Sequence, residues 1–173
     1  MEAYMKKLLF CFSLLLTIIS LIVNIGTYVI KNYQYYYSFT FIIHGLIFIP
    51  LAIMIFQRRN EFGNKLKIKN LYVNIIKTLI PNGNNIIYII SGICFIYAFI
   101  NFFVTFQYIA NGMAEIIDGK YVLNNHGEIT EITKEMYGKQ KIYEMRLFSG
   151  HWILFSIIPM FYFFYNGIKN NRL

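Results

Sequence analysis

The sequence has few charged residues, few cysteines and only one tryptophan. Asp, Glu, Lys and Arg together make up 14% of its 173 residues, whereas soluble chains carry about 25%. Hydrophobic residues reach 57% and the mean hydropathy is +0.49. Such a chain has too little polar surface to cover a soluble domain, and it is too apolar for intrinsic disorder. Two cysteines exclude a disulfide-rich scaffold. The composition predicts a membrane protein.

Motifs of the familiar soluble enzymes are also missing. The sequence contains no glycine-rich phosphate loop, no G-x-S-x-G elbow and no H-E-x-x-H helix. Cys11 and Cys94 lie inside apolar runs without a C-x-x-C partner, so we expect them to act as small apolar residues. No metal and no cofactor is expected, because the scattered histidines and carboxylates form only a weak pattern for zinc.

Four stretches lack charge for long enough to cross a bilayer, which takes about 20 helical residues. Polar and turn residues trim them to predicted spans near 8–30, 36–56, 86–108 and 149–167. The first span follows two lysines like a signal peptide, but its length and the lack of a small-residue cleavage site favour a retained anchor. We therefore predict one membrane domain, residues 1–173, that is an all-α integral membrane protein with a four-transmembrane-helix bundle.

The distribution of charge predicts the orientation of this bundle. The N-terminus, the segment 57–77 and the tail 168–173 hold ten of the 16 basic residues and two of the 8 acidic ones. The positive-inside rule therefore places both termini in the cytoplasm. The excess charge is expected to meet anionic lipid headgroups on that side. Nucleic acid is not an expected partner, since the basic residues lack interleaved stacking aromatics.

Two segments between the spans have patterns of their own. In the cytoplasmic segment 57–85, apolar residues from Leu66 onward recur at helical spacing and predict an in-plane amphipathic helix. In the extracytoplasmic segment 109–148, residues 120–123 and 128–133 predict a small β-hairpin. Its loop motif is Asn125, His126 and Gly127, which accept positive φ. Thr133 is the predicted N-cap of a helix that continues past two glycines into the fourth span.

Five polar residues are predicted in or near the outer half of the spans, and they are the candidate functional cluster. Polar groups inside a membrane are energetically costly and often functional, but they also hold helices together through interhelical hydrogen bonds. For His44 and Asn101 the structural role is favoured; for the remaining three both interpretations stay open. The cluster comprises His44, Asn101, Glu144, Arg146 and His151.

Four phrases of the sequence resemble a widespread family of small uncharacterised four-span bacterial inner-membrane proteins. They are YAFINFF at 97–103, GKYVLNNHG at 119–127, EITKEMY at 131–137 and RLFSGHW at 146–152. The resemblance covers about 97–165 and implies a bacterial inner (cytoplasmic) membrane, but no activity and no catalytic residue. It includes His126, Arg146, Gly150 and His151 in the shared pattern. Met136 departs from it, because an acidic residue is expected there.

The overall plan is also similar to immunity proteins against pore-forming colicins, although the likeness is one of topology only. It suggests a non-enzymatic protein that binds or regulates another membrane component, as an immunity-type or effector-accessory subunit. The expected partner is a protein or a second copy of the chain. The second hypothesis is a small oligomeric channel or transporter that uses the polar cluster. A membrane enzyme using Glu144, Arg146 and His151 ranks third.

Overall fold

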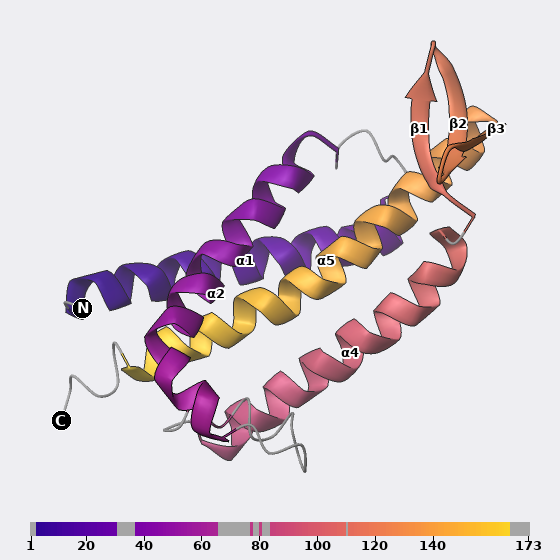
Figure 1. Cartoon of the computed structure of the whole chain (residues 1–173). Coiled ribbons are helices and arrows are strands. Elements are labelled where there is room, and N and C mark those ends of the chain that lie inside the picture. The colour runs from indigo at the N-terminus through magenta and orange to yellow at the C-terminus, as the bar shows by residue number, and fades with distance from the viewer. Residues whose placement is uncertain are drawn as a thin grey trace.

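The computed structural model describes residues 3–30, 37–65, 77, 80, 84–109 and 111–166. Figure 1 shows a bundle of long helices, one of which runs across its neighbours, with a small sheet at one end. The helices are α1 (Ala3–Val29), α2 (Tyr37–Lys65), α4 (Asn85–Ile109) and α5 (Lys134–Phe164). The strands are β1 (Met113–Ile117), β2 (Lys120–Asn125) and β3 (Glu128–Glu131).

Helix α5 is the centre of the bundle. It packs against α1, α2 and α4, with α1 making the most extensive contact. In its apolar window 61% of the residues are buried, compared with 33% or less in each of the other three helices. A small core around Leu16, Ile47 and Trp152 joins α1, α2 and α5. Helix α5, the last of the described helices, is therefore the one whose apolar segment is most buried.

Helix α1 buries its polar face and exposes its apolar face. The residues turned inward recur at spacings of three and four, and the side chains on the opposite side are large and apolar. Buried positions are Ser13, Thr17, Ser20, Asn24 and Thr27, and exposed ones include Leu15, Ile18, Ile22 and Ile25. Thr17 and Ser20 donate hydrogen bonds to backbone carbonyls one turn earlier. This is the reverse of an amphipathic helix in a soluble protein.

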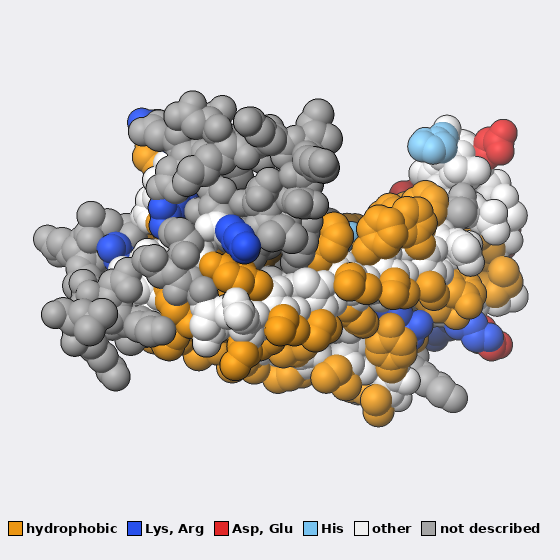
Figure 2. Space-filling model, turned by 90° about the horizontal axis from the view of Figure 1, so that it is seen from below, with side chains coloured by type: hydrophobic (Ala, Val, Ile, Leu, Met, Phe, Trp, Pro, Cys, Tyr) orange, Lys and Arg blue, Asp and Glu red, His pale blue; other side chains and the backbone are white. Residues whose placement is uncertain are grey.

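Apolar side chains cover much of the visible surface along the bundle. Figure 2 shows them over the long face of the molecule, while the acidic side chains that are coloured in this view lie at the end that carries the sheet. On α4 the strip Ile89, Ile93, Ile96, Ile100 and Phe103 is more than half exposed. Within the described residues, four helices are long and apolar enough to span a membrane, which confirms the predicted number.

The predicted element bounds agree in part. The N-cap at Thr133 is confirmed, since its hydroxyl accepts a hydrogen bond from the Met136 amide, and α5 continues unbroken past both glycines. The fourth helix therefore starts at Lys134, well before the predicted span at 149. Helix α2 continues to Lys65, into the segment predicted to be cytoplasmic. The predicted amphipathic helix from Leu66 lies almost wholly outside the described residues.

The predicted hairpin is part of a three-stranded antiparallel sheet in the order β1-β2-β3. Two tight turns connect the strands, and both central residues of each turn have positive φ: 51° and 78° at Asp118-Gly119, and 53° and 98° at His126-Gly127. Such turns match the right-handed twist of paired strands. Strand β1 was not predicted because its sequence, MAEII, lacks alternation. It provides the third strand that a marginal hairpin needs.

Candidate functional site

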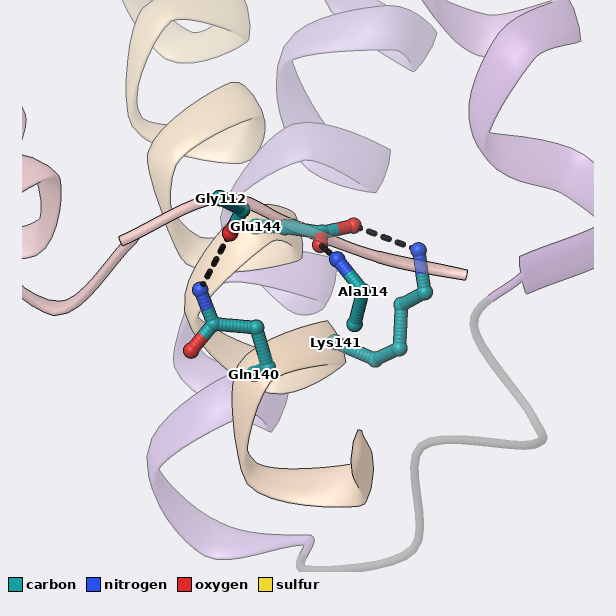
Figure 3. Close-up of polar contacts among 5 residues, drawn as sticks. All are labelled: Gly112, Ala114, Gln140, Lys141 and Glu144. Carbon is teal, nitrogen blue, oxygen red and sulfur yellow. Dashed lines mark hydrogen bonds and ion pairs between the residues drawn. The ribbon is translucent and has the colours of Figure 1, made fainter. Parts of the chain in front are cut away.

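The sheet is fastened to α5 by buried polar contacts, which we call the sheet anchor (Figure 3). The Glu144 carboxylate accepts a hydrogen bond from the Ala114 amide at 2.9 Å and from the Lys141 ammonium at 2.8 Å. One turn earlier, the Gln140 side chain donates to the Gly112 carbonyl at 3.0 Å. The anchor consists of these five residues: Gly112 just before β1, Ala114 within β1, and three residues of α5.

The ion pair in the sheet anchor is almost completely removed from solvent. The side chains of Lys141 and Glu144 are 4% and 6% exposed. A buried charge is costly unless its partner and its hydrogen bonds are supplied, so each member depends on the other. By contrast, the Lys120–Glu131 pair on the sheet surface has both side chains 63% exposed. The anchor is therefore the stronger determinant of how the sheet sits on the bundle.

A second group of polar contacts, the interhelical network, joins α1, α4 and α5. Its centre is the Arg146 backbone carbonyl, which accepts hydrogen bonds from Asn101 at 2.9 Å, Ser149 at 3.3 Å and Asn24 at 3.5 Å. The Asn24 amide also donates to the Ser149 hydroxyl at 2.9 Å, and its oxygen accepts from the Tyr97 hydroxyl. Three helices thus share one set of paired polar groups.

The absence of a side chain at Gly150 makes this network possible. A Cβ atom built at Gly150 would lie 2.2 Å from the Asn101 amide nitrogen and 2.9 Å from its Cγ. Gly150 and Asn101 are both buried, at the contact between α5 and α4. A glycine at this position therefore allows Asn101 to reach the carbonyl of α5.

The Arg146 side chain points away from α4, toward the C-terminal end of α1. Its guanidinium donates to the Thr27 hydroxyl at 3.2 Å and to the Thr27 carbonyl at 2.7 Å. The last carbonyls of a helix lack partners within the helix and carry partial negative charge, so a cation there is stabilising. The same guanidinium lies over the Tyr28 ring at 3.9 Å and near the Tyr143 ring at 5.3 Å.

Two histidines belong to a third group, the aromatic cluster. Its rings connect α2, α5 and α4 through successive edge and tilted contacts with centroids 5.1–6.3 Å apart. The Trp152 indole donates to Nδ1 of His44 at 2.9 Å, so this nitrogen carries no proton. Nδ1 of His151 lies 2.8 Å from the Leu147 carbonyl and therefore carries its proton. The cluster contains His44, Phe48, Phe102, Phe148, His151, Trp152 and Phe155.

The predicted candidate residues are distributed over these three groups. Asn101 meets the backbone of Arg146, Glu144 belongs to the sheet anchor, and His44 and His151 belong to the aromatic cluster. The loop motif, Asn125 with His126 and Gly127, is exposed at the β2–β3 turn. Within the described parts of the chain, no three metal-ligating side chains come together.

Several residues that complete these contacts were not among the predicted candidates. Lys141 precedes Glu144 by three positions, a spacing that places two charges together on a helix. Thr27 follows Asn24 by three positions on the buried face of α1. Both spacings are visible in the sequence and could have identified these residues. The hydroxyl of Tyr97 reaching Asn24 could not be inferred, because it depends on how α4 docks.

Comparison with models of protein families, with curated proteins and with solved structures finds no match to this chain. The resemblance to four-span bacterial membrane proteins therefore stays a prediction.

Proposed function

We propose that the chain spans a bacterial inner membrane four times, with both termini cytoplasmic and the sheet outside. The reversed burial of α1 supports this, since its hydroxyl face is buried and its apolar face is exposed. Small polar residues at helix contacts with large apolar residues outside are typical of membrane helix packing. In water, the exposed strips of α1 and α4 would form an unusually large apolar surface.

The proposed function is the non-catalytic binding or regulation of another membrane component. The aromatic cluster is the observation that supports it. His44 and His151 are only partly buried, and Phe48 in the same cluster is 41% exposed. An imidazole facing hydrocarbon is unfavourable, and polar groups in membrane helices almost always face protein or water. A helix of a partner protein, or of a second copy, would cover these rings.

The pairing of the other polar residues favours binding over transport or catalysis. A channel or an enzyme needs polar groups that can meet a solute or substrate. In the interhelical network the Asn24 and Asn101 amides donate to side chains or carbonyls of α5 instead. The Glu144 carboxylate similarly accepts hydrogen bonds from Lys141 and β1. We therefore assign these residues to holding the bundle together.

Photocrosslinking in membranes tests the proposed binding face. A benzophenone amino acid in place of Phe48 is expected to give one discrete adduct, from a protein helix next to the aromatic cluster. Ile22, which is 65% exposed on α1, is the matched control and should give lipid adducts only. An adduct at twice the chain mass identifies a second copy, and any other mass identifies a different protein. Equal crosslinking at both positions, or none at Phe48, would refute the assignment.

A further inference from the structure

A groove of about 1040 Å³ lies between the end of α1 and the first turns of α5. Thr27 and Tyr28 line it from α1, and Lys134, Lys139 and Arg146 line it from α5. The groove belongs neither to the aromatic cluster nor to the sheet anchor. Arg146 links it to the interhelical network, because its carbonyl serves that network while its guanidinium faces the groove.

The lining of the groove has an excess of positive charge. Among the described residues, the lining contains three cations and one carboxylate, Glu135, which is paired with Lys139 at 2.8 Å. The first turn of α5 also lines the groove and contributes the positive end of its dipole. The C-terminal end of α1 carries the negative end of its helix dipole, and the hydrogen bond from the Arg146 guanidinium to the Thr27 carbonyl offsets this negative charge. The groove is therefore suited to a negatively charged group.

Arg146 is held in a fixed orientation within this lining. Its guanidinium donates two hydrogen bonds to Thr27 and lies over the Tyr28 ring. A guanidinium has five donor hydrogens, and the two bonds to Thr27 use only part of this set. A planar, oriented guanidinium binds phosphate oxygens with little further loss of conformational entropy.

An apolar surface leads directly to the groove. On α1, Ile22, Ile25 and Tyr28 are 65%, 60% and 58% exposed, and they follow one another along the helix. Tyr28 belongs to both the strip and the groove. A ligand with an anionic head and long apolar tails matches this arrangement, whereas a small free anion would leave the strip unused. Tyrosine at the junction is typical of a membrane–water interface.

We propose that this groove binds the phosphate-bearing headgroup of an anionic phospholipid, with its acyl chains along the exposed strip of α1. Lys134, Lys139 and Arg146 surround the phosphate, and Tyr28 lies at the boundary between head and tails. The inference rests on the proposed membrane location, because only in a bilayer do the acyl chains of a lipid lie against the exposed apolar strip of α1.

Native mass spectrometry of the full chain in a neutral detergent tests this inference. Phosphatidylglycerol is expected to bind more tightly than zwitterionic phosphatidylcholine. The double variant Lys134→Gln/Lys139→Gln changes exposed residues only and should keep the wild-type melting temperature. Its affinity for phosphatidylglycerol should fall by about 25-fold, at roughly fivefold per lysine. Lys120→Gln, which removes one positive charge on the sheet surface, is the control for each lysine and should leave lipid binding unchanged.

Two outcomes would overturn the lipid assignment. Binding of phosphatidylglycerol that is equal to that of phosphatidylcholine, or unchanged in the double variant, would exclude a headgroup site in the groove. Complete displacement of phosphatidylglycerol by inorganic phosphate would show an anion site that does not use the tails. Both results differ from failure of the proposed membrane location, which would appear as a protein that stays soluble without detergent.

Discussion

Replacement of Glu144 by glutamine is expected to destabilise the protein by about 3–5 kcal/mol, the usual cost of removing one member of a buried ion pair. The glutamine retains an oxygen that can accept from the Ala114 amide, but the buried Lys141 ammonium loses the carboxylate 2.8 Å away. Hydrogen exchange at the Ala114 amide and chemical unfolding of the purified chain measure the effect. We expect faster exchange in β1 as the sheet loosens from α5.

The exposed ion pair on the sheet is the matched control for this prediction. Glu131→Gln removes the carboxylate from a pair whose side chains are both 63% exposed, so it should cost about 1 kcal/mol or less. Adding Lys141→Met to Glu144→Gln removes both buried charges and should restore much of the lost stability. Equal effects of Glu144→Gln and Glu131→Gln would contradict the sheet anchor.

Replacement of Gly150 by alanine is the second change with a large expected effect. The new Cβ would lie 2.2 Å from the Asn101 amide nitrogen, so Asn101 must move and lose its hydrogen bond to the Arg146 carbonyl. Overpacking of this kind costs about 1–3 kcal/mol. Chemical unfolding followed by fluorescence measures the loss, and Trp152 reports it without labelling because it is the single tryptophan.

Two further variants separate this steric conflict from a general effect of alanine. Gly45 lies in α2, where an added Cβ would meet no atom within 4 Å, so Gly45→Ala should be neutral or stabilising by up to about 1 kcal/mol. In an Asn101→Ala background the conflicting amide is absent, and Gly150→Ala should become nearly neutral. If the costs of the two substitutions simply add, the pair is not coupled and the interpretation is wrong.

The helices and the turns could be predicted from local sequence. Long uncharged runs predict the number of helices that are long and apolar enough to span a membrane, Thr133 marks the start of α5, and Asp118-Gly119 and His126-Gly127 mark tight turns. Each signal lies within a few residues of the feature that it determines. Strand β1 lacked such a signal, because MAEII has no alternation and becomes a strand by pairing with β2.

The grouping of the candidate residues depended on tertiary packing and could not be read from spacing. Glu144 and Arg146 are two positions apart on α5, yet one faces the sheet and the other faces the end of α1. His44 accepts the hydrogen bond from Trp152 only because α2 packs against α5 at the level of these two residues. The sequence therefore singles out these polar residues within apolar helices, whereas their contact partners depend on how the four helices dock.

The central claim, a four-span protein with the sheet outside and the termini inside, is tested most directly by cysteine accessibility. In a chain with Cys11 and Cys94 replaced by alanine, a single cysteine is placed at the exposed Thr130 in β3 or the exposed Arg59 in α2. A membrane-impermeant maleimide should label Thr130→Cys in intact spheroplasts and Arg59→Cys only after lysis. Labelling of both positions in intact spheroplasts, or of Arg59→Cys alone, would contradict the proposed topology.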